Sequence, residues 1–169
     1  DSFSIAEVWR AKLQRKRFTP ALYAKVARAA SWLHQMICPV TGDGPNLGAN
    51  DGALLLQLTD SAYRDYRPSV QLSSALFGAG MPYPEAPLCD LHLGWLGIIS
   101  KEFKKQEYVN CDYDCGGYKI LRSGVADLFF RYPRFRFRPS QSDALHIDLR
   151  INGVSFLRDA GSFSYNSTP

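Results

Sequence analysis

Towards the C-terminal end of the chain, apolar and polar residues alternate with the period of a half-buried β-strand. Leucine and isoleucine occupy every second position from Leu145 to Ile151, and the residues between them are His146, Asp148 and Arg150. This alternation predicts a strand with one apolar and one polar face. An Asn-Gly dipeptide follows at once and favours a type I′ turn, so the pattern predicts a β-hairpin.

The tight turn also predicts which residues lie opposite one another in this hairpin. Counting outward from the turn, the expected pairs are Ile151 with Val154, Arg150 with Ser155, Leu149 with Phe156, and His146 with Asp159. Directly opposed Cβ atoms lie about 5 Å apart. At that distance a histidine and an aspartate can orient an imidazole for proton transfer or supply two ligands to a divalent metal. The alternative is an ordinary cross-strand pair, which sheets form more often.

Helical spacing and capping signals dominate the first half of the chain. The segment from Ser4 to Glu7 matches a capping box, which predicts a helix over residues 5–16. Thr19-Pro20 supplies the N-cap and the first position of a second helix. His34 lies in this second helix, where we expect a packed or surface histidine. A third, short helix is expected over residues 69–77.

The periodicity changes from helical to strand-like between residues 100 and 115. Residues 118–122 and 125–132 alternate as strands on either side of a turn at Ser123-Gly124. We therefore expect an α+β fold with a helical domain over residues 1–105 and a strand domain over residues 106–169. Because a two-stranded hairpin is only marginally stable alone, we also expect the remainder of the same polypeptide, upstream and downstream, as a partner.

Two polar segments carry further candidate chemistry. Residues 41–52 contain four glycines and one proline and end in Asn50, Asp51 and Gly52. Asn50 and Asp51 can point into a cleft and bind substrate, or bond nearby backbone amides in a turn. In residues 133–139, strand alternation places three arginines on one face: Arg134, Arg136 and Arg138. Such a ladder suits carboxylates or sulfates, although pairing with acidic residues of neighbouring strands explains it equally well.

Composition narrows the class of protein further. A net charge of only +4 permits an anionic ligand and does not require nucleic acid. The longest nearly apolar run, residues 93–99, is too short for a membrane segment. The four cysteines lack paired C-x-x-C spacing, so a cysteine-based metal site is not expected, whereas disulfides and a periplasmic or secreted location remain open.

Three segments together resemble the heparinase II/III-like family of polysaccharide lyases. They are residues 44–52, residues 137–149 (Phe-Arg-Pro-Ser-Gln-Ser-Asp-Ala-Leu-His-Ile-Asp-Leu), and residues 157–161 with Tyr165-Asn166. The resemblance spans most of the chain. It implies the C-terminal end of an (α/α) toroid followed by the start of an antiparallel β-sandwich. It also implies that an acidic, uronic-acid-containing polysaccharide is cleaved by β-elimination.

The resemblance assigns roles to individual residues. Gln141 stands where the family has a histidine, and a neutral amide is neither a general base nor a usual zinc ligand. We expect Gln141 to donate to the uronate carboxylate and His146, oriented by Asp159, to transfer a proton. Tyr165 is a second candidate for proton transfer. Asp159 is the candidate ligand of a structural divalent metal such as zinc.

Two other classes of protein stay open beside the lyase. A non-catalytic carbohydrate-binding or scaffold relative keeps the sandwich and the arginines but has lost the chemistry, as Gln141 suggests. A nucleic-acid-binding module comes third, and the modest net charge argues against it. The family's further toroid residues and its downstream His-Asn motif have no match here, so we do not expect these 169 residues alone to turn over substrate.

Overall fold

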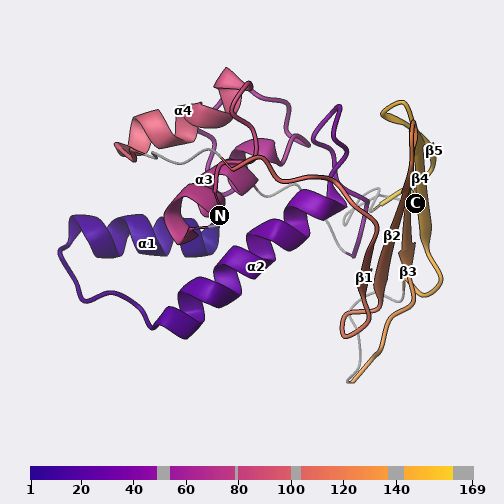
Figure 1. Cartoon of the computed structure of the whole chain (residues 1–169), viewed down its shortest axis with the longest axis horizontal. Coiled ribbons are helices and arrows are strands. Elements are labelled where there is room, and N and C mark those ends of the chain that lie inside the picture. The colour runs from indigo at the N-terminus through magenta and orange to yellow at the C-terminus, as the bar shows by residue number, and fades with distance from the viewer. Residues whose placement is uncertain (49–53, 79, 100–103, 137–142, 162–169) are drawn as a thin grey trace, which may run out of the picture. The chain divides into compact units, whose positions relative to one another are not determined.

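The computed structural model describes residues 1–48, 54–78, 80–99, 104–136 and 143–161. The chain divides into two compact units. A helical unit comprises Asp1–Ile37 and Leu54–Tyr108, and a strand unit comprises Cys38–Ala53 and Val109–Pro169. The helices and the antiparallel sheet confirm the α+β class (Figure 1). Among the described residues, no helix combines the length and apolar character needed to cross a membrane.

The helical unit contains four helices within the described residues. They are α1 (Ser2–Lys12), α2 (Pro20–Met36), α3 (Arg67–Phe77) and α4 (Pro87–Leu96). The predicted start of α2 is confirmed, because Thr19 Oγ1 accepts a hydrogen bond from the Leu22 amide at 3.3 Å and Pro20 is the first helical residue. Helix α3 ends at Gly78, whose φ of 80° is left-handed. Leu72, Met81 and Leu93 form a buried apolar cluster in this unit.

The predicted bounds of the first helix are wrong. Helix α1 begins at Ser2 with Asp1 as its N-cap, and Ser4 is buried inside it, so no capping box forms. Glu7, the other half of the expected box, instead pairs with the Arg10 guanidinium and accepts a hydrogen bond from the Tyr23 hydroxyl at 2.7 Å. The tertiary partners of Glu7 therefore prevail over the local capping signal.

The strand unit contains one five-stranded antiparallel sheet in which each strand pairs with the next along the chain (Figure 1). The strands are β1 (Cys111–Tyr113), β2 (Tyr118–Ser123), β3 (Ala126–Arg131), β4 (Ile147–Ile151) and β5 (Val154–Leu157). The predicted Asn152-Gly153 turn is present, and the turn between β2 and β3 lies one residue later than predicted, at Gly124 and Val125. Gly124 has a φ of 52°, and Asn152 and Gly153 have φ values of 50° and 79°, as a type I′ turn requires.

The register of the last hairpin agrees with the prediction only next to the turn. Ile151 faces Val154 and Arg150 faces Ser155, but the register then shifts, and Leu149 faces Leu157 rather than Phe156. The extra residue in β5 is a β-bulge, which moves every later residue of that strand by one position. The β4–β5 ladder stops at the Leu149–Leu157 pair, so the expected opposition of His146 and Asp159 is not part of it.

The two faces of the sheet differ in a way that the sequence does not suggest. Opposed leucines cross four strands on one face: Leu121, Leu128, Leu149 and Leu157. This leucine row is partly open, with 44% of Leu121 and 52% of Leu157 exposed. On the opposite face Phe129, Asp148 and Arg150 are at most 2% exposed. The polar face of β4 is therefore the buried one.

Candidate functional site

The buried polar face of β4 carries an ion-pair network centred on Arg158. The Arg158 Nη2 atom donates to Asp43 Oδ2 at 2.5 Å and to the Gly44 carbonyl at 3.0 Å. Its Nε atom donates to Asp148 Oδ2 at 3.3 Å. The β-bulge accounts for this pairing, because it places Arg158 one position beyond the Leu149–Leu157 pair and hence across from Asp148.

Arg150 adds a second buried cation to the same network. Its Nη1 atom donates to the Asp43 carbonyl at 2.5 Å, and its Nε atom lies 3.7 Å from Asp148 Oδ1. The Asp43 carbonyl also accepts the Cys38 amide at 2.8 Å, which holds the loop after α2 in a tight turn. With one side chain and one carbonyl, Asp43 thus binds both arginines of the hairpin. Neither Asp43 nor Arg158 was predicted as a site residue.

Two further contacts tie the same loop to the hairpin. Asp143 Oδ2 accepts the Gly48 amide at 2.8 Å and the Arg131 Nη1 atom at 2.7 Å. Asn46 Nδ2 donates to the Asp159 carbonyl at 3.0 Å. We call the set formed by the loop and the hairpin the loop–hairpin junction; its members are Asp43, Gly44, Asn46, Gly48, Arg131, Asp143, Asp148, Arg150, Arg158 and Asp159.

His146, the predicted proton-transfer residue, does not meet Asp159 in the described residues. Its Nε2 atom is buried and forms no hydrogen bond with any described residue. Its ring lies against Phe129, with centroids 6.5 Å apart, and its carbonyl accepts the Arg131 amide. The structure thus brings His146 to the buried polar face of the sheet without assigning its Nε2 atom a partner among the described residues.

Asp159 has local structural roles in the described residues. Its Oδ1 atom accepts the Gly161 amide at 2.6 Å, which closes a turn. No three histidine, cysteine, aspartate or glutamate side chains come together as a metal site within the described ranges. The zinc ligand role of Asp159 therefore stays a prediction.

The arginine ladder is not a strand in its described part. Strand β3 ends at Arg131, and residues 132–136 are irregular, because Pro133 has no amide to donate to a ladder. Arg134 instead pairs with Asp114, with Nη2 and Oδ1 2.5 Å apart, in an exposed ion pair. Pairing with a neighbouring acidic residue is the alternative that the sequence left open. Five other predicted site residues lie outside the described ranges: Asn50, Asp51, Arg138, Gln141 and Tyr165.

The helical unit contains a second buried polar cluster, around His34. Its Nδ1 atom lies 2.7 Å from the Tyr83 hydroxyl, and its Nε2 atom lies 3.1 Å from the Gln106 carbonyl. A carbonyl can only accept, so Nε2 carries a proton, and a neutral ring then accepts from Tyr83 at Nδ1. Burial raises the pKa of the Tyr83 phenol, which keeps it a donor. This confirms His34 as a packed histidine, with partners that no sequence pattern indicated.

No known protein family, curated protein or solved structure matches this chain.

Proposed function

We propose that this chain is the toroid-to-sandwich portion of a heparinase II/III-like polysaccharide lyase that cleaves acidic, uronic-acid-containing polysaccharide by β-elimination. The observation that carries the proposal is the loop–hairpin junction. The segments that resemble the family are remote in sequence, yet Asp143 binds the Gly48 amide and Asn46 binds the Asp159 carbonyl. The polar loop before Asn50 and the hairpin that carries His146 thus belong to one structural unit.

The exposed apolar surface supports the proposed architecture. A β-sandwich needs an apolar sheet face for its second sheet to cover, and the leucine row is such a face. A toroid needs helices with apolar residues for neighbouring helices to cover, and α1 and α4 expose 67% of Trp9 and 73% of Trp95. A contiguous exposed apolar face such as the leucine row marks a surface that another element can cover.

The reaction sets three chemical requirements. The proton at C5 of a uronate becomes acidic only when the adjacent carboxylate is neutralised, and the reaction also needs a base at C5 and an acid at the leaving oxygen. In this proposal Gln141 donates to the carboxylate, and the Nε2 atom of His146, which has no partner among the described residues, transfers a proton. Tyr165 serves as the second proton-transfer group, and Asn50 and Asp51 bind substrate.

The remaining roles belong to substrate binding and positioning. Arg134, Arg136 and Arg138 hold neighbouring acidic sugars in this proposal, with the Arg134–Asp114 pair opening to admit a carboxylate. Asp143 is a positioning residue, since it fixes Gly48 two residues before Asn50 and lies three residues before His146. A structural divalent metal at Asp159 is part of the same proposal.

A carbohydrate-binding relative without catalysis is the second candidate. The observation that favours it is Gln141 at the position of the family's histidine, because an amide cannot act as a general base. This alternative keeps the arginines and the loop–hairpin junction but predicts binding without product.

The test is the ultraviolet absorbance of unsaturated uronate products when the full-length polypeptide is incubated with a panel of acidic polysaccharides. We expect one polymer to give product and His146→Ala to lower kcat roughly 100-fold, the usual contribution of a general acid or base. Asp112→Ala is the matched control in the same unit, on an exposed pair with Lys119, and should leave kcat unchanged. Polymer binding with no product from any substrate would replace the lyase by the carbohydrate-binding relative.

A further inference from the structure

A groove of about 580 Å³ opens in the helical unit between the loop after α1 and the C-terminal end of α3. The residues that matter for its chemistry are Arg17, Phe18, Tyr23, Phe77 and Gly78. All of them belong to the helical unit, and none is part of the loop–hairpin junction. The groove is therefore a separate candidate for ligand binding.

Tyr23 organises the aromatic side of this groove. Its hydroxyl donates to Glu7 Oε1 at 2.7 Å, and its ring centroid lies 5.4 Å from that of Phe77. The Arg17 guanidinium carbon lies over the same ring, 4.9 Å from its centroid, in a cation–π contact. These contacts fix the position of Arg17, while the Phe18 ring beside it stays 38% exposed. A ligand thus meets a positioned guanidinium and an open aromatic ring.

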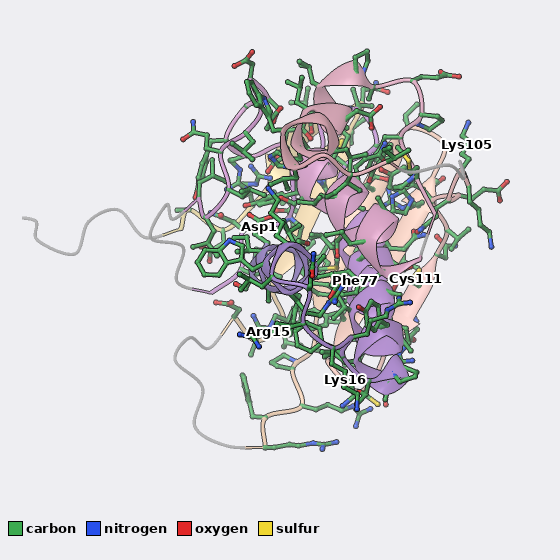
Figure 2. The ribbon with its side chains drawn as sticks, turned by 90° about the vertical axis from the view of Figure 1, so that its left-hand side faces the viewer. Asp1, Arg15, Lys16, Phe77, Lys105 and Cys111 are labelled. Atoms are coloured by element: carbon green, nitrogen blue, oxygen red, sulfur yellow. The ribbon has the colours of Figure 1, made fainter. Side chains whose placement is uncertain are left out.

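The charge around the groove favours an anion. The segment from residue 8 to residue 18 contains five basic residues and no acidic one: Arg10, Lys12, Arg15, Lys16 and Arg17. Within the described residues Glu7 pairs bidentately with Arg10 and also attracts Arg17, so one carboxylate stands against the five cations of this segment. Figure 2 shows Arg15 and Lys16 projecting outward from the chain in this part of the helical unit. The local field therefore attracts negatively charged ligands.

The end of α3 restricts which anion fits. The last carbonyls of a helix have no partners in the helix and form the negative end of its dipole. Here that end is the segment from Ala75 to Gly78, which lines the groove. Carbonyl acceptors suit the hydroxyl groups of a sugar, whereas any anionic group must bind on the Arg17 side of the groove. An aromatic ring, a guanidinium and carbonyl acceptors together match the apolar face, the carboxylate and the hydroxyls of an acidic sugar.

We propose that this groove is a binding subsite for one uronate unit of an acidic oligosaccharide. Phe18 packs against the sugar ring, Arg17 binds the carboxylate bidentately, and the α3 carbonyls accept sugar hydroxyls. The choice of sugar rests on the proposed function, whereas the groove and its charge do not. Gly78 contributes by leaving open space, because nothing lies within 4 Å of the position that a Cβ would take there.

The experiment titrates the whole chain with uronate trisaccharides and with a neutral trisaccharide, using calorimetry. We expect a uronate trimer to bind, the neutral trimer to bind at least about tenfold more weakly, and Arg17→Gln to raise the Kd of the uronate at least about tenfold. Phe18→Ala should weaken both sugars. The matched control is Arg15→Gln, which removes the same charge two residues away from a side chain outside the groove lining.

Three results would overturn the subsite: no uronate trimer binds, Arg15→Gln and Arg17→Gln weaken binding equally, or a DNA oligonucleotide of equal charge competes as well as the uronate. The last two indicate charge attraction alone, with a steep salt dependence. Because Arg17 and Phe18 are exposed, both variants should fold, and thermal unfolding checks this. If the full-length polypeptide forms product but binds no trimer in the groove, the subsite is wrong and the lyase stands. If the full-length polypeptide binds the trimer but forms no product from any polymer, the lyase is wrong and the subsite stands.

Discussion

His92 is a buried imidazole in the helical unit with only 1% of its surface exposed. Neither ring nitrogen forms a hydrogen bond among the described residues, and the cavity beside it, about 20 Å³, has room for about one water molecule. Burial lowers the pKa of His92 from its ordinary value of 6.5. The carbonyls of Pro68 and Leu56 favour the protonated ring and partly offset this decrease. The folded protein therefore keeps this ring neutral at pH values where the unfolded chain protonates it.

This difference predicts a pH dependence of stability. Below pH 6.5 the unfolded state binds a proton that the folded state does not, so the free energy of unfolding falls as the pH drops from 6.5 towards the lowered pKa of His92. The slope is at most about 1.4 kcal/mol per pH unit. His92→Phe should flatten it, as measured by urea unfolding at several pH values. Equal slopes for the wild type and His92→Phe would show that His92 is not the titrating group.

At the scale of elements, two glycines in neighbouring turns of the sheet differ in what surrounds them. Gly117 lies between β1 and β2 with a φ of 68°, and a Cβ there would lie 2.2 Å from the Tyr132 carbonyl oxygen. Gly124 lies between β2 and β3 with a φ of 52°, and nothing lies within 4 Å of its Cβ position. Of these two positions, both would force a substituted residue into the left-handed region, and only at Gly117 would its Cβ also clash with backbone.

We therefore expect Gly124→Ala to cost about 1 kcal/mol, the penalty for an L-residue in the left-handed region. Gly117→Ala should cost roughly 3 kcal/mol or more, because the Tyr132 backbone is held beside Gly117 by the hydrogen bond from its amide to the Gly117 carbonyl. Urea unfolding of both variants, compared with the wild type, gives the difference directly. Similar costs for the two substitutions would mean that the backbone at Tyr132 moves aside freely.

The sequence predicts those parts of the elements that depend on neighbouring residues. Asn152-Gly153 and Thr19-Pro20 carry their turn or cap chemistry locally and are confirmed, whereas the turn predicted at Ser123-Gly124 lies one residue later, at Gly124 and Val125. The β-bulge has no such local signal. It accompanies the pairing of Arg158 with Asp148 in the sheet and with Asp43, which is 115 residues away in sequence.

In the candidate site too, local patterns could be predicted from the sequence and long-range contacts could not. The alternation around His146 predicts the polar face of β4, and the composition of residues 41–52 makes that segment a candidate for polar chemistry. Their association was not predictable, because it depends on the contact of Asp143 with Gly48, 95 residues apart, and on no periodic pattern. The buried polar face likewise reverses the usual expectation that polar strand residues face solvent, and Asp43 accepts a hydrogen bond from each of its two arginines.

At the scale of the whole molecule, each compact unit contains one fully buried cysteine. Cys89 lies in the helical unit and is 2% exposed, and Cys38 lies in the strand unit and is 0% exposed. Burial also raises the pKa of Cys89 to about 12, so the reactive thiolate is scarce in the folded state. Cys115 is exposed, and all four cysteines are free thiols. The labelling rates of Cys38 and Cys89 can therefore report the opening of each unit separately.

Asp148→Ala should accelerate thiol labelling of Cys38 far more than labelling of Cys89. The substitution leaves the buried Arg150 guanidinium without its neighbouring carboxylate, which costs about 3 kcal/mol and corresponds to roughly a 100-fold rise in the open population. Tyr83→Phe is the matched control in the helical unit. It removes the hydrogen bond to His34, costs about 1 kcal/mol, and should accelerate Cys89 instead.

Pulsed labelling followed by mass spectrometry of cysteine-containing peptides measures both rates in one sample, and Cys115 serves as the internal standard for reagent activity. Asp148→Ala should accelerate the labelling of Cys38 more and Tyr83→Phe that of Cys89 more, because each variant removes an interaction confined to one unit. An equal acceleration of Cys38 and Cys89 in both variants would mean that the units open together. The chain would then unfold as one cooperative structure, and the stability of the loop–hairpin junction could not be separated from that of the helices.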